Sequence, residues 1–172
     1  MKKVLLIPLF ISAIILLSSC IRYDNSGSLA DDHFEQLLDA IGKNDADAVN
    51  KLFSEKAKAE AEGHEANIEV LFEFVQGNVI SWNRLWRHGS KTSTYGIQSN
   101  LVRTMYEVKT DVDEYMLYIY DYVRDDTDPT NQGIYYLRVF KAEDRDLYYK
   151  STEGSIVPGI YIPPEYFDTE IE

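Results

Sequence analysis

The chain has 172 residues, a single cysteine and a formal net charge of −12. Nucleic-acid phosphates would repel so acidic a chain, so its composition argues against a nucleic-acid partner. One cysteine also excludes a disulfide within the chain. At this length we expect one domain, large enough to fold without disulfides or metals.

Residues 1–19 differ in character from everything that follows. Lys2 and Lys3 precede an almost wholly apolar run over residues 4–17, and the first acidic residue is Asp24. The run is short for a membrane-spanning helix, which needs about 20 apolar residues. This layout is typical of a secretory signal peptide, so we predict that residues 1–19 are removed. An ordinary N-terminal membrane helix is the alternative.

The signal ends in Leu17-Ser18-Ser19-Cys20, which resembles the lipobox of bacterial lipoproteins. The resemblance implies that Cys20 receives a diacylglycerol thioether and becomes the mature N-terminus. The expected location is therefore the cell membrane, with the domain lipid-anchored through Cys20 and facing outward. The mature chain would hold 15 basic and 29 acidic residues, a net charge of −14. That balance offers no polybasic patch to anionic lipids, so the lipid must provide the attachment.

The predicted helices occupy the first half of the mature chain. We expect a tether over residues 20–30, and helices over residues 31–43, from Asn44 as N-cap to about residue 62, and over residues 68–76, ended by Gly77. The residues expected in the core from their helical spacing are Leu37, Ile41, Leu52, Phe53, Leu71, Phe72 and Val75.

The predicted strands follow these helices without interruption. They cover residues 78–87, 92–95, 100–110, 115–124, 133–141, 147–151 and a short edge strand within 155–162. Turns are expected at residues 89–91, 111–114, 125–132 and 143–146. The domain should span residues 31–163, and residues 164–172 should form an acidic tail.

Helices followed by a meander of strands predict an α+β fold, with N-terminal helices packed on a strongly bent antiparallel sheet. The arrangement resembles the cone-shaped nuclear-transport-factor-two-like fold, which implies a pocket between helices and sheet. Residues 52–57, 71–77, 81–82, 121–122, 133–139 and 159–161 also resemble a small family of bacterial lipoprotein domains of uncharacterised function. That resemblance covers about residues 31–163 and supplies no catalytic residue.

One candidate site depends on the register of the hairpin 115–124/133–141. If Arg124 faces Gly133, then Asp121 and Arg138 are diagonal neighbours on one face, with Tyr136 beside them. The group suits a polar ligand or an acid–base site. Trp82 could line the pocket mouth, although we expect it in the core. We prefer a structural ion pair as the explanation, and a slip of one residue would separate the two charges.

Other polar groups give weaker indications. The tyrosines 118, 120 and 122 are expected on a half-buried sheet face, with hydroxyls reaching water. The histidines 33, 64 and 88 are expected at the surface, and the aspartates 125, 126 and 128 in a solvated turn, since the loop lacks the glycine and glutamate of a calcium site. The sequence shows no motif for catalysis, a metal or a cofactor.

Three functions remain open at this point. The preferred one is a non-catalytic module that binds a small molecule or an envelope protein, because no reactive group of residues stands out. The alternatives are an enzyme with an acid–base site around Asp121 and a purely structural partner domain.

Overall fold

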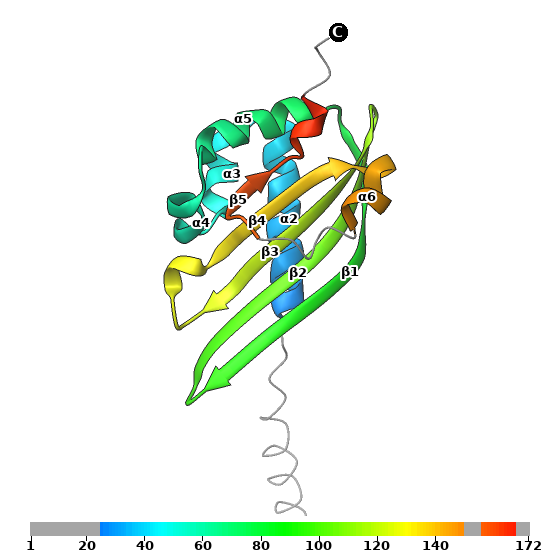
Figure 1. Cartoon of the computed structure of the whole chain (residues 1–172). Coiled ribbons are helices and arrows are strands. Elements are labelled where there is room, and N and C mark those ends of the chain that lie inside the picture. Colours follow the sequence, from blue (N-terminus) through cyan, green and yellow to red (C-terminus); the bar gives the residue numbers. More distant parts are fainter. Residues whose placement is uncertain (1–24, 150–155, 168–172) are drawn as a thin grey trace, which may run out of the picture.

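The computed structural model of the chain describes residues 25–149 and 156–167. Within them helices precede the sheet, as predicted, apart from one short helix that follows the fourth strand (Figure 1). The helices are α2 (Ser26–Lys43), α3 (Ala46–Leu52), α4 (Glu55–Glu60), α5 (His64–Phe74) and α6 (Arg145–Tyr149). The strands are β1 (Val79–Thr94), β2 (Ile97–Thr110), β3 (Glu114–Asp125), β4 (Gly133–Lys141) and β5 (Gly159–Tyr161). The predicted signal peptide and Cys20 lie outside the described residues. No helix within them is long and apolar enough to cross a membrane.

Helix α2 begins earlier than predicted. Residues 26–30, expected in the tether, form its first turns. Contacts with the sheet stabilise them: the Asn100 side-chain amide donates to the Ser26 hydroxyl at 3.1 Å, and Ala30 is buried. The helix therefore crosses one face of the sheet and contacts β1, β2 and β3 (Figure 1).

The junction between α2 and α3 also differs from the prediction. Asn44 has a left-handed backbone (φ 50°), and its N–H bonds to the carbonyls of Ala40 and Ile41. Asn44 is thus the C-cap of α2, a position where asparagine tolerates this conformation. Asp45 instead caps α3, because its carboxylate accepts from the Ala48 N–H at 2.9 Å.

The helix predicted from residue 45 to residue 62 is broken into α3 and α4. Phe53 forms a parallel bridge with Ile134 of the sheet, and the Ser54 N–H donates to the Ile134 carbonyl at 3.0 Å. Gly133 permits this close approach, because an added Cβ would lie 2.8 Å from the Leu52 carbonyl oxygen. The start of β4 is therefore bonded directly to the helical layer.

The five strands form one open sheet in the order β1-β2-β3-β4-β5, antiparallel except for β5, which pairs parallel to β4. The predicted turn at residues 89–91 is wrong, because β1 continues to Thr94. Tyr95 and Gly96, both with positive φ, make the turn to β2. The predicted strand 147–151 is also wrong where the structure describes it, since residues 145–149 are helical.

The face of the sheet that lies under α2 to α5 forms one apolar core. Of the predicted core residues, five are buried, namely Leu37, Ile41, Phe53, Leu71 and Val75, whereas Leu52 and Phe72 are partly buried against the same cluster. Helix α5 ends at Phe74, before Gly77, and Phe74 takes the buried position that we predicted for Phe72. Both the helices and the sheet therefore contribute side chains to this core.

The opposite face of the sheet carries a second cluster, built from Met105, Met116, Tyr118, Tyr120, Tyr136 and Phe140. The prediction that the tyrosine hydroxyls of this face reach water is wrong for Tyr118 and Tyr120. Both are buried, and the Tyr118 hydroxyl donates to that of Tyr120 at 3.0 Å. The sheet is therefore apolar on both faces.

We expect Phe34→Ala to destabilise the protein by about 3–5 kcal/mol, the usual cost of truncating a buried phenylalanine. Phe34 is fully buried, its ring stacks on Tyr106 at 3.6 Å between centroids, and it meets Trp82 edge-on at 5.1 Å. Urea unfolding measures the change. Ile80→Ala is the control: Ile80 is 62% exposed and should change stability by less than about 0.5 kcal/mol. Equal effects of the two variants would contradict this core assignment.

Candidate functional site

A histidine–carboxylate pair joins α2 to β3. His33 Nδ1 lies 2.7 Å from Asp121 Oδ2. The Asp121 side chain is 2% exposed, whereas that of His33 is 30% exposed. The second carboxylate oxygen, Oδ1, is buried and has no hydrogen-bond partner among the described residues. Asp121 is therefore an interior charge whose one described partner reaches the surface.

The strand pattern explains why a carboxylate lies here. Tyr115, Leu117 and Ile119 of β3 all face the helices and are buried, and Asp121 is the next residue in this row. His33 precedes Phe34 on α2, at the flank of the buried stripe of that helix. The pair of His33 and Asp121 therefore lies at the end of this row of buried side chains, at the boundary between the core and the surface.

The pair changes the acidity of the imidazole. The hydrogen bond that His33 donates to Asp121 raises the pKa of His33 above its ordinary value of 6.5, against a smaller opposing effect of burial. Because Nδ1 is bonded to Asp121, Nε2 is the nitrogen that remains for a ligand. Near neutral pH, His33 therefore carries more positive charge than an isolated histidine.

His33 lines a pocket of about 590 Å³ between the helices and the ends of β3 and β4. Its walls come from α2, α3, the end of β3 and the start of β4. The lining residues are His33, Gln36, Asp39, Ala40, Lys43, Asp45, Ala48, Lys51, Leu52, Tyr122, Val123, Gln132 and Gly133. This volume lies within the range of about 300–1,000 Å³ that is usual for small-molecule sites.

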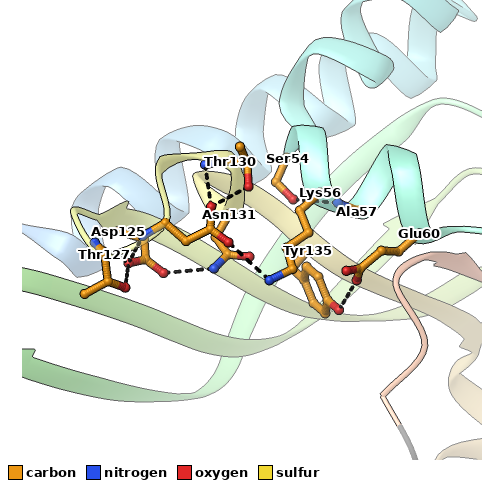
Figure 2. Close-up of polar contacts among 10 residues, drawn as sticks. Ser54, Lys56, Ala57, Glu60, Asp125, Thr127, Thr130, Asn131 and Tyr135 are labelled. Carbon is orange, nitrogen blue, oxygen red and sulfur yellow. Dashed lines mark hydrogen bonds and ion pairs between the residues drawn. The ribbon is translucent and has the colours of Figure 1, made fainter.

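The loop between β3 and β4, which supplies Gln132, is held by its own polar contacts (Figure 2). Asp125 is buried and accepts from the Thr127 N–H and the Asn131 amide, both at 3.0 Å. Burial would raise the pKa of Asp125, but these hydrogen bonds outweigh it and lower that pKa. The expectation of a solvated turn is therefore wrong for Asp125.

Helix α4 is attached to the same region (Figure 2). Lys56 donates to Asp128 at 3.2 Å, and the Tyr135 hydroxyl donates to Glu60 at 2.8 Å. These bonds connect α4 to the loop and to the start of β4. They hold in place the segment that supplies Gln132 and Gly133 to the pocket.

The predicted pairing of Asp121 with Arg138 is wrong. A β-bulge interrupts the β3–β4 ladder: Tyr120 pairs with Tyr136, whereas Asp121 pairs with Ile134, which leaves Tyr135 as the extra residue. Side chains after the bulge therefore change face. Asp121 faces the helices, and Arg138 lies on the opposite face of the sheet.

The other predicted site residues also lie apart from Asp121. The Arg138 guanidinium lies over the Tyr161 ring, 5.1 Å from its centroid, and the Tyr136 ring lies 5.8 Å from that of Tyr120. Trp82 contacts Phe34 in the core on the helix side, and it does not line the pocket. The four residues do not form one site, and a ligand role for each of them stays a prediction.

No local pattern indicates that His33 belongs to a site, because its partner is 88 residues away. Of the histidines that we expected at the surface, only His88 is exposed. His64 is 7% exposed, and burial lowers its pKa. Among the described residues, no three histidine, cysteine or acidic side chains come together as metal ligands.

One family model matches the chain. It is described as a domain of unknown function, DUF5104, and it covers residues 36–142. The match includes Asp121 and most of the pocket wall and begins just after His33. No curated protein matches the chain.

The pair predicts how stability depends on pH. Since the pKa of His33 is raised in the folded protein, its contribution is fully present below about pH 6.5 and is lost as the pH rises through the folded-state pKa. Relative to His33→Gln, the wild type should lose stability over that window. An NMR titration should give His33 a pKa above 6.5, and Asp121→Asn should lower that pKa. A pKa of 6.5 or below in the wild type would contradict the pairing.

Proposed function

The chain belongs to the DUF5104 family, whose function is unknown, and from its own geometry we propose a lipid-anchored module that binds a small polar molecule beside His33. The proposal places the module on the outward face of the cell membrane. It depends above all on one observation: a buried carboxylate holds a half-exposed imidazole at the wall of an open pocket.

The cost of burying Asp121 supports this assignment. A carboxylate taken out of water is costly unless it is paired and hydrogen-bonded. Here the partner is a titratable side chain that lines a cavity, and one carboxylate oxygen has no described donor. Titratable groups with a perturbed pKa, such as His33, occur more often at functional sites than elsewhere.

The lining indicates the class of ligand. His33 and Lys51 provide positive charge, whereas Lys43 is paired with Asp39 at 2.7 Å and the Asp45 carboxylate accepts from the Ala48 N–H. Ala48 and Leu52 add apolar surface. We therefore propose a small molecule with one anionic or hydrogen-bond-accepting group and a short apolar part.

An enzyme is the second candidate, and the same pair favours it. A buried carboxylate that accepts from Nδ1 fixes the tautomer and orientation of an imidazole and stabilises its protonated form, which suits His33 for acid–base catalysis. Asp121 would then be a positioning residue. A purely structural partner domain is less favoured, because the pocket is open and not filled by side chains.

The finer fold resemblance belongs to this proposal as well. We propose that the sheet is bent into the cone of the nuclear-transport-factor-two-like fold. Irregularities between β1 and β2, between β2 and β3 and between β3 and β4 support this proposal, because bulges bend and twist the strands that contain them.

Ligand binding predicts a specific effect of His33→Gln. Addition of small carboxylic acids and phosphate esters, one at a time, should shift backbone NMR signals of residues that line the pocket. A hydrogen bond to a charged group contributes about 1.5–3 kcal/mol, so His33→Gln should weaken the binding roughly ten- to hundredfold.

The control is His88→Gln, which removes an exposed histidine on β1 and should leave the affinity unchanged. Equal affinities for the wild type and His33→Gln would refute the site. Chemical conversion of a bound compound that stops in His33→Gln would establish the enzyme instead of the binding module.

The proposed lipid anchor predicts the mass of the mature protein. Mass spectrometry of the membrane fraction should show a chain that starts at Cys20 and carries a diacylglycerol thioether. Cys20→Ala should release the protein from the membrane fraction, whereas Ser18→Ala, which keeps a small residue before the cleavage site, should not. An intact N-terminus at Met1 would contradict the proposal.

A further inference from the structure

The tip of the β1–β2 hairpin, residues 93–98, projects beyond the start of α2 (Figure 1). Two apolar side chains are exposed on it: Tyr95 is 102% exposed and Ile97 is 50% exposed. The tip is therefore outside the layered core, and nothing in the fold requires apolar residues there.

The backbone of the tip carries a second signal. Tyr95 (φ 51°) and Gly96 (φ 87°) form the two-residue turn with positive φ at both positions. Glycine, asparagine and aspartate favour such turns, and a tyrosine at positive φ is disfavoured. No packing of the Tyr95 side chain against other described residues offsets the cost of this backbone conformation, because the side chain is exposed. This points to a contact outside the chain.

Charge sets the same hairpin apart from the rest of the chain. Residues 79–106 contain no Asp or Glu, although the chain has a net charge of −12. Arg84 and Arg87 share the single carboxylate of Asp31, and Lys91 adds a further positive charge. The hairpin is therefore the part of this acidic protein that an anionic surface repels least.

The hairpin tip lies at the end of the molecule from which the predicted anchor leaves. Asn100 of β2 bonds Ser26 at the start of α2, and β2 reaches from there to Ile97, about 10 Å further at 3.4 Å per residue. The five residue steps from Cys20 to Asn25 span at most roughly 18 Å. A lipid on Cys20 and the tip can therefore reach one bilayer surface together.

We infer that the hairpin tip rests in the interfacial layer of the bilayer, with Tyr95 and Ile97 among the lipid headgroups. Tyrosine is enriched at this depth, where its ring lies in the apolar layer and its hydroxyl stays wet. The contact would orient the domain on its anchor. This inference rests on the proposed lipid on Cys20.

The test uses the processed, full-length lipoprotein with Tyr95→Cys. A thioether-bonded Cys20 does not react with thiol reagents, so a nitroxide label attaches at position 95 alone. The protein is reconstituted into vesicles of phosphatidylethanolamine and phosphatidylglycerol. Electron paramagnetic resonance then compares collisions of the label with oxygen and with a water-soluble nickel chelate.

The matched control is Val112→Cys, at the turn that follows the other end of β2 and 63% exposed. At position 95, collisions with nickel should fall several-fold relative to position 112, and collisions with oxygen should rise. Equal nickel access at the two positions, with the lipid on Cys20 confirmed by mass, would overturn the inference and leave the anchor intact.

Two further outcomes also decide the matter. The label could be inaccessible to the nickel chelate in intact cells but accessible to it on vesicles. That result would overturn the inference, and it would indicate instead a contact with an envelope protein or with a second copy of the chain. An unmodified Cys20 in the mass spectrum would refute the anchor and this inference together.

Discussion

The β-bulge at Tyr135 decides which side chains of the sheet lie under the helices. Ile134 before it and Leu137 after it both face the helical layer and are fully buried. Strict alternation could bury only one of these two residues on that face. Without the extra residue, Ile134 would share its face with Tyr136 and Arg138, and a guanidinium would enter the core at high cost. Burial of aliphatic side chains therefore favours the bulge.

The consequences of the bulge reach α2 and the pocket. Asp121 lies beside Ile134 in the ladder, so the same register turns its carboxylate toward His33. On the other side of α2, Asp31 accepts from Arg84 at 2.5 Å and from the Tyr106 hydroxyl at 2.8 Å. The helix is thus fixed to β1 and β2 by one carboxylate and to β3 by another. These attachments, together with the buried Phe34, place His33 over the central strand β3, where the core meets the surface.

Local patterns predicted much of this fold. Helical spacing identified the apolar stripe of α2, and the bounds of β4 agree with the prediction. The sequence even contained a sign of the bulge, because Ile134 and Leu137 are three residues apart, whereas Leu137 and Val139 are two apart. A strand that buries all three must hold one extra residue between the first two. We assumed regular pairing, and Asp121 was therefore assigned the wrong partner.

The remaining errors come from interactions between distant segments. Gly89 resembles a turn residue, yet it lies opposite Val102 in the paired ladder of β1 and β2, and the chain turns at Tyr95 instead. The predicted helix over residues 45–62 breaks because Phe53 bridges to Ile134, a contact that local propensity cannot reveal. His33 escaped notice for the same reason, since its importance arises only when β3 comes beneath it.

The position of Asp121 in the apolar row supports the function that we propose for the pocket. An apolar side chain at this position would continue the row of Tyr115, Leu117 and Ile119, and replacing a buried ion pair by well-packed apolar groups is often neutral or stabilising. We therefore infer that stability alone does not explain a carboxylate at this position. A pocket that presents an imidazole does need one, because the carboxylate fixes the ring and favours its protonated form. Sequences depart from local rules mainly at functional sites, and this carboxylate departs from the apolar pattern beside a cavity of suitable size.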